Sequence, residues 1–100
     1  MMEKELSIDE FKLPFKVFAD CVPVRGSLKS ILVDLNRNSY FDIPNDLYDL
    51  IINCEGKSIF EILTIYGENN RLGIMEYFDF LIKNELIFFT EYPNDFPKID

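Results

Sequence analysis

The sequence contains no histidine and no tryptophan, and it has only four glycines and two cysteines. Without histidine there is no imidazole base, no histidine metal ligand and no Ser-His or Cys-His nucleophile pair. The glycines are scattered, so they form neither a phosphate-binding loop nor a dinucleotide-binding fingerprint. The spacing of Asp42, Asp46 and Asp49 does not follow that of a calcium loop. We therefore expect no active site, no metal and no cofactor within this chain.

Long apolar runs are also lacking, because none approaches the roughly 18 residues that a membrane-spanning helix needs. The N-terminus lacks the basic and then apolar order of a signal peptide, so a cytoplasmic location is expected. Cys21 and Cys54 are far apart and lie among apolar neighbours, which favours structural packing over redox or metal chemistry.

Basic residues are too few to balance the acidic ones, since ten stand against 18 and the formal net charge is −8. A surface of that sign repels phosphate backbones and anionic lipid headgroups, so neither a nucleic acid nor a membrane is expected as a partner. Among the 100 residues, 48% are hydrophobic, with ten Phe and five Tyr. This composition predicts one folded domain.

The first half of the chain has the pattern of β-strands. Residues 15–18 and 22–25 are aromatic and β-branched, and they predict one bent or interrupted strand. Residues 30–35 alternate so that one face is uniformly apolar and the other mixed; the apolar face holds Ile31, Val33 and Leu35, and the mixed face holds Ser30, Leu32 and Asp34. Residues 36–38 predict a hairpin turn, after which residues 39–43 return as a third strand.

The second half has helical spacing. After Pro44, Asn45 or Asp46 is expected to cap a helix that ends at Gly56. A second helix starts with a capping box at Ser58 and Glu61 and ends at Gly67. A third helix runs from about residue 70 to 84, and residues 87–91 form a brief strand.

The third predicted helix has an unusually wide apolar face, which spans about 160° when successive residues are turned by 100°. Phe80 lies just outside it, and Glu76, Asp79 and Lys83 form the polar stripe. Two interpretations remain open and are compatible. The helix is central in a small core, or part of its apolar face lines a groove for a partner.

These elements predict an α+β fold, similar to a winged helix-turn-helix, in which a three-stranded antiparallel sheet is followed by three helices and a short C-terminal strand. Many such folds bind DNA, but the charge of the third helix argues against it. A three-stranded sheet has two edges, and an uncovered edge offers unpaired N–H and C=O groups to an incoming peptide.

Residues 18–26, 31–40 and 43–48 together resemble the N-terminal domain of radical SAM/SPASM peptide maturases, particularly those of grasp-with-spasm systems. That domain is a PqqD-like recognition element for RiPP precursor peptides. The resemblance covers residues 15–100, and the hairpin followed by Ile-Pro-Asn-Asp is its most specific part. It implies binding of the leader of a ribosomally made precursor as a strand added to the third strand, beside the third helix.

The resemblance also implies a catalytic domain outside this chain, with S-adenosylmethionine and iron–sulfur clusters as its cofactors. Two distant cysteines cannot supply the Cys-x-x-x-Cys-x-x-Cys motif of such a cluster. We therefore expect the chain to bind and not to catalyse, and we interpret residues 93–100 as the start of a linker to that domain.

The peptide-binding residues that we predict lie on the third strand and the third helix; they are Ser39, Tyr40, Phe41, Asp42, Ile43, Met75, Glu76, Phe78, Asp79 and Ile82. The strand supplies main-chain hydrogen bonds, and Phe41, Met75, Phe78 and Ile82 supply apolar pockets. Glu76 and Asp79 are candidates to receive a basic leader residue. Core packing is the simpler interpretation of Phe78.

Residues 1–14 form an arm ahead of the recognition domain, which we place at residues 15–92. Residues 5–13 resemble the recognition segment of precursor leaders. Three interpretations are open: a natural arm with a helical turn capped by Ser7 and Glu10, a leader segment joined to the domain, or a mimic that occupies the groove until substrate displaces it.

A leader-like arm has little chain with which to reach the groove of its own molecule, because only Pro14 separates it from the first strand. We therefore predict exchange of the arm between molecules, in a domain-swapped dimer or an open chain of molecules, with Leu6, Ile8 and Phe11 as apolar anchors. An alternative function is a regulatory winged-helix module that binds another protein through the same apolar surface.

Overall fold

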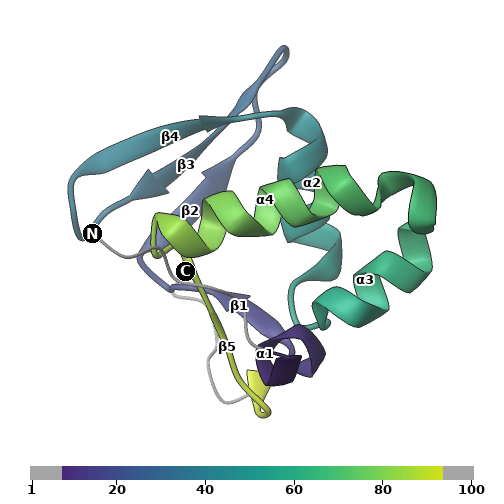
Figure 1. Ribbon diagram of the computed structural model, residues 1–100. Helices are drawn as coiled ribbons and strands as arrows, with labels where there is room; N and C mark the ends of the chain where they lie inside the picture. The colour runs from purple at the N-terminus through teal and green to yellow at the C-terminus, as the bar shows by residue number, and fades with distance from the viewer. Residues whose placement is uncertain (1–7, 94–100) are drawn as a thin grey trace.

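The structure is a computed structural model that describes residues 8–93. Its elements, in chain order, are α1 (Ile8–Lys12), β1 (Phe15–Val17), β2 (Cys21–Val24), β3 (Ser30–Asp34), β4 (Ser39–Ile43), α2 (Asn45–Cys54), α3 (Ile59–Tyr66), the 3-10 helix η1 (Glu68–Asn70), α4 (Arg71–Lys83) and β5 (Ile87–Phe89). This is an α+β fold in which α4 crosses the middle of the molecule, with the sheet of β2, β3 and β4 on one side and α3 on the other (Figure 1).

The main sheet is antiparallel with the order β2-β3-β4, as the sequence predicts. Leu32 of β3 lies opposite Phe41 of β4 and opposite Pro23 of β2. The predicted hairpin turn between β3 and β4 is confirmed, and Asn38 adopts a φ of 55° within it. Asparagine tolerates this left-handed backbone because its short side chain forms local hydrogen bonds.

The prediction of one interrupted strand over residues 15–25 is wrong, because β1 and β2 belong to different sheets. Between them the chain turns, and the Cys21 N–H donates to the Phe18 carbonyl at 2.9 Å. β1 pairs instead with β5, antiparallel, with Phe15 opposite Phe89. The first and last strands of the described residues thus lie side by side in a second, two-stranded sheet (Figure 1).

The mixed face of β3 is the one that points into the core. Ser30, Leu32 and Asp34 are buried, whereas Ile31 and Val33 are only half-buried. The polar members have internal partners: the Ser30 hydroxyl donates to the Asn45 Oδ1, and the Asp34 carboxylate accepts from the Arg37 backbone N–H at 3.1 Å. These hydrogen bonds offset the free-energy cost of burying the polar side chains of Ser30 and Asp34. The mixed face of β3 can therefore point into the core, and the apolar face with Ile31 and Val33 points outward.

The helices lie close to their predicted positions, with one difference at the start of α2. Pro44 is the N-cap there and no side chain caps the helix, because the Asn45 side chain bonds to Ser30 instead. The predicted capping box of α3 is confirmed. The Glu61 N–H donates to the Ser58 hydroxyl, and the Ser58 N–H donates to the Glu61 carboxylate, each at 3.1 Å.

The core lies where α2, α3 and α4 meet the inner face of the sheet and the β1–β5 ladder. Phe15 and Phe78 are fully buried and make an edge-to-face contact with their ring centroids 5.1 Å apart. The buried apolar side chains come from every strand and from α2, α3 and α4. One core therefore holds both sheets and these three helices together.

Candidate functional site

The sheet has two edge strands, and β2 is the one that is closed to an incoming strand. Alternate residues of a strand direct their N–H groups to the same side, so Cys21 and Pro23 face one way. The Cys21 N–H already donates to Phe18, and proline has no N–H. The outer side of β2 therefore offers no free backbone donor, which is a common protection of edge strands.

The other edge strand, β4, contains no proline. The Leu35 N–H donates to the Asp20 carbonyl at 2.9 Å, so the odd-numbered residues of β3 direct their backbone groups to β2. The even-numbered residues of β3 then bond to β4, where their partners are Ser39, Phe41 and Ile43. Tyr40 and Asp42 are left with N–H and C=O groups directed away from the sheet, and no other strand pairs with β4 within residues 8–93.

The side chains beside this edge come from both faces of β4. Tyr40 is 66% exposed on the outer face, and Asp42 pairs there with Lys29 at 3.3 Å between carboxylate and ammonium. On the inner face, Phe41 makes an edge-to-face contact with Phe80 of α4, with ring centroids 5.9 Å apart. This contact, which we call the Phe41–Phe80 ring pair, connects β4 to α4.

The structure changes which residues of α4 belong to this surface. Met75 lies about 140° around the helix from Phe80, so it does not share the side that meets β4. Glu76 precedes Phe80 by four residues and lies on the same side, about 40° away. Glu76 and Asp79 are both exposed, but Asp79 is farther from that side. Glu76, which the sequence predicts, therefore stays in the candidate site, Phe80 is added to it, and Met75 and Asp79 are left out.

Three of the predicted residues are part of the core and do not line an open surface. The side chains of Ile43, Phe78 and Ile82 are buried, and Phe78 has no exposed surface because it packs against Phe15. Phe80, which the periodicity placed outside the apolar arc, is the residue that sequence reasoning missed. The sequence does contain a sign of its role, because Phe80 is an aromatic residue next to the polar stripe of the helix that Glu76 and Lys83 form.

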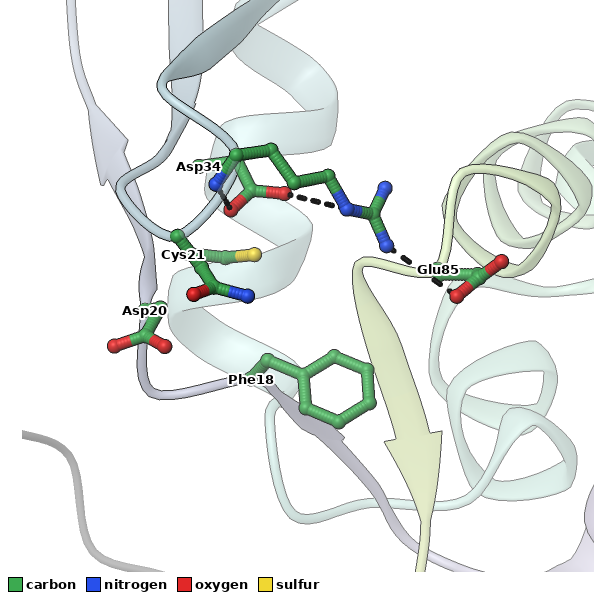
Figure 2. Close-up of a pocket in the computed structure, with 7 residues that line it drawn as sticks. Phe18, Asp20, Cys21, Asp34 and Glu85 are labelled. Atoms are coloured by element: carbon green, nitrogen blue, oxygen red, sulfur yellow. Dashed lines mark hydrogen bonds and ion pairs between the residues drawn. The ribbon is translucent and has the colours of Figure 1, made fainter.

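Arg37 connects the β3–β4 turn to the end of α4. Its guanidinium donates to the Asn84 carbonyl at 2.9 Å, lies 3.3 Å from the Glu85 carboxylate and 3.4 Å from the buried carboxylate of Asp34. Figure 2 shows the ion pairs that run from Asp34 and from Glu85 to the same guanidinium, and all three residues line a cavity of about 170 Å³. The connection fixes the hairpin that carries β4 relative to α4.

Cys21 faces the same cavity, as Figure 2 shows. Burial, followed by the negative charge of Asp34, raises the pKa of the thiol to about 11. A thiol of such a high pKa is protonated at neutral pH and is a poor nucleophile. This cavity is therefore a structural junction without a reactive group.

A larger cavity of about 470 Å³ lies between α2 and α4 and is lined by Asp46, Asp49, Tyr66 and Tyr77 among others. Burial raises the pKa of both tyrosines, with the Cys54 thiol as the next cause at Tyr66 and Asp46 at Tyr77. Asp49 already pairs with Arg25. The raised pKa values disfavour the phenolate form of both tyrosines, which is the nucleophilic form of this side chain.

Within residues 8–93, no three His, Cys, Asp or Glu side chains gather where they could hold a metal ion. The same residues include no helix with the length and apolar composition required to cross a bilayer.

The arm is described from Ile8 onward, and it is helical there. α1 packs against α3, and Phe11 packs against the core of its own chain. Pro14 forms a bridge with Ser58, and its carbonyl accepts from the Thr90 N–H at 2.9 Å. Leu6 and Ser7 lie outside the described residues, and so does residue 94 onward of the predicted linker. Ile8 is described by its backbone alone.

The chain was compared with family models, with curated proteins and with solved structures, and none of the three comparisons found a match. The candidate site therefore rests on geometry alone. It is the edge of β4, with the side chains of Tyr40, Phe41, Asp42 and Phe80 around it.

Proposed function

We propose that this chain is a winged-helix-like peptide-recognition domain, which binds an extended peptide by adding it as a strand to β4. The precursor-recognition elements that the sequence resembles suggest the substrate, which is the leader of a ribosomally made peptide. In this proposal the domain presents that peptide to a radical SAM maturase.

The observation that carries the proposal is the asymmetry of the sheet edges. The outer side of β2 offers no free donor, whereas β4 directs the N–H and C=O groups of Tyr40 and Asp42 outward. Strand addition derives its affinity from such main-chain groups and its selectivity from alternate side-chain pockets. In this proposal the side chains of the bound peptide on the helix side contact the Phe41–Phe80 ring pair and the exposed carboxylate of Glu76.

A proline scan of β4 tests the proposal. Peptides that bind the full chain are first selected from a displayed library of random dodecapeptides, and one of them is titrated by calorimetry. Tyr40→Pro removes an outward N–H that β3 does not use, and the loss of one hydrogen bond with steric blocking of the edge is expected to weaken binding by about tenfold or more.

Tyr40→Ala is the matched control, because it removes the side chain and keeps the N–H; its loss is expected to stay below about fivefold. Asp42→Pro repeats the test at the second outward position, and circular dichroism verifies that each variant is folded. Full affinity in folded Tyr40→Pro and Asp42→Pro variants would refute strand addition at β4. A regulatory module that binds only folded partners predicts that no short peptide is enriched.

A further inference from the structure

The outer face of the main sheet is apolar, although the open face of an antiparallel sheet is normally polar. Val22, Val33 and Tyr40 lie opposite one another in a single row across β2, β3 and β4. Val22 and Tyr40 are 37% and 66% exposed, and Leu35 beside them is 63% exposed. A hollow of about 180 Å³ is lined by Ile31, Val33, Leu35 and Tyr40 among others.

The adjacent row on this face ends in a charge. In this second row Val24, Ile31 and Asp42 lie opposite one another. The first row therefore ends at the open edge with Tyr40, and the second row ends there with Asp42. These two residues, Tyr40 and Asp42, are also the ones whose backbone groups point outward. A strand that bonds to them continues both rows, because directly opposite residues of paired strands place their side chains on the same face.

We infer that β4 selects its peptide from the outer face as well as from the helix side. The residue opposite Tyr40 is apolar and the residue opposite Asp42, two positions away, is basic. Across two paired strands, an aromatic or aliphatic side chain pairs favourably with an exposed tyrosine, and a basic side chain pairs favourably with a carboxylate. This inference rests on the proposed function, and it adds a sequence pattern for the peptide.

Charge favours a separate peptide over the β4 strand of a second copy. The sequence of β4 is Ser-Tyr-Phe-Asp-Ile, which has no basic residue to place opposite Asp42. Two β4 strands that pair in antiparallel fashion set Asp42 against Asn38, Tyr40 or Asp42 of the second copy. None of these registers places a cation opposite Asp42, and the last one places like charges directly opposite each other, which is unfavourable. A basic peptide, in contrast, also complements the net charge of −8.

A charge swap tests the inference. The double variant Lys29→Asp with Asp42→Lys preserves the local ion pair and the net charge, but it reverses the sign at the edge. With a library-selected peptide that contains the pattern, we expect the double variant to bind about fivefold more weakly than the wild type at low salt. The same peptide with glutamate in place of the basic residue is expected to show the opposite preference.

The result separates this inference from the proposal on which it rests. If Tyr40→Pro abolishes binding but the two proteins do not differ in their charge preference, the outer-face pattern is refuted and strand addition stands. If neither Tyr40→Pro nor Asp42→Pro alters binding, strand addition itself is refuted. Selected peptides that lack a basic residue two positions from an apolar one, or a free chain that sediments as a dimer through β4, would also overturn the inference.

Discussion

The side chain of Cys21 has a chemistry that is set by its neighbours. It lies at the start of β2, buried, with the carboxylate of Asp34 opposite it in the sheet. Burial and that negative charge both disfavour the thiolate, which raises the pKa from 9.0 to about 11. The unfolded chain loses this proton at lower pH than the folded one. The stabilising contribution of the thiol is thus complete below pH 9 and is lost as the pH rises toward 11.

This shift predicts slow alkylation of Cys21. At pH 8 the thiolate fraction falls from about 9% to about 0.1% between the two pKa values, so iodoacetamide is expected to react about 100-fold more slowly than with the unfolded chain. Peptide-resolved mass spectrometry distinguishes Cys21 from Cys54, and the reaction in concentrated urea supplies the reference rate. Equal rates in the folded and unfolded chain would contradict the assignment.

At the scale of single elements, the hairpin of β3 and β4 depends on its connection to α4. Arg37 reaches from the turn to Asn84 and Glu85 at the helix end, while Phe41 contacts Phe80 nearer the middle of the helix. The cation also balances the buried carboxylate of Asp34. These contacts set the position of the open β4 edge relative to Glu76 and Phe80.

Loss of the Arg37 connection should therefore destabilise the chain. Arg37→Met leaves the Asp34 carboxylate buried without its cation, and we expect the free energy of unfolding to fall by about 1–3 kcal/mol. Urea unfolding followed by circular dichroism measures it. Arg71→Met is the matched control, because the pair that Arg71 makes with Glu68 at 3.8 Å is exposed, and its effect should stay within about 0.5 kcal/mol. Equal effects of the two substitutions would contradict the structural role of Arg37.

The elements themselves show what the sequence predicts well. The β3–β4 hairpin, the capping box of α3 and the extent of α4 depend on neighbouring residues, and local chemistry defines them. The inward face of β3 does not follow from periodicity, because Ser30 and Asp34 are buried on account of partners at Asn45 and Arg37. The contact of Phe80 with Phe41 likewise depends on how α4 crosses the sheet, and no local pattern specifies that crossing.

For the whole molecule, the least predictable feature is the pairing of β1 with β5. Each strand has three residues, and more than sixty residues of chain separate Val17 from Ile87. Short strands carry a weak pattern, and pairing across such a distance depends on the assembled core. Phe15 occupies the centre of that assembly: it pairs with Phe89, its ring contacts Phe78, and its backbone bonds to Gly56 and Lys57.

Phe15 is consequently the residue on which closure of the fold most depends. Phe15→Ala removes a fully buried ring and leaves a cavity against Phe78, and we expect a loss of about 3–5 kcal/mol in the free energy of unfolding. Domains of this size have a total stability of about 5–15 kcal/mol, so the loss is a large fraction of it. Phe60→Ala removes the same ring from a site that is 61% exposed, and its effect should be within about 0.5 kcal/mol. Urea unfolding of both variants measures the difference, and a Phe15→Ala loss below about 1 kcal/mol would show that closure of the fold does not depend on the Phe15 ring.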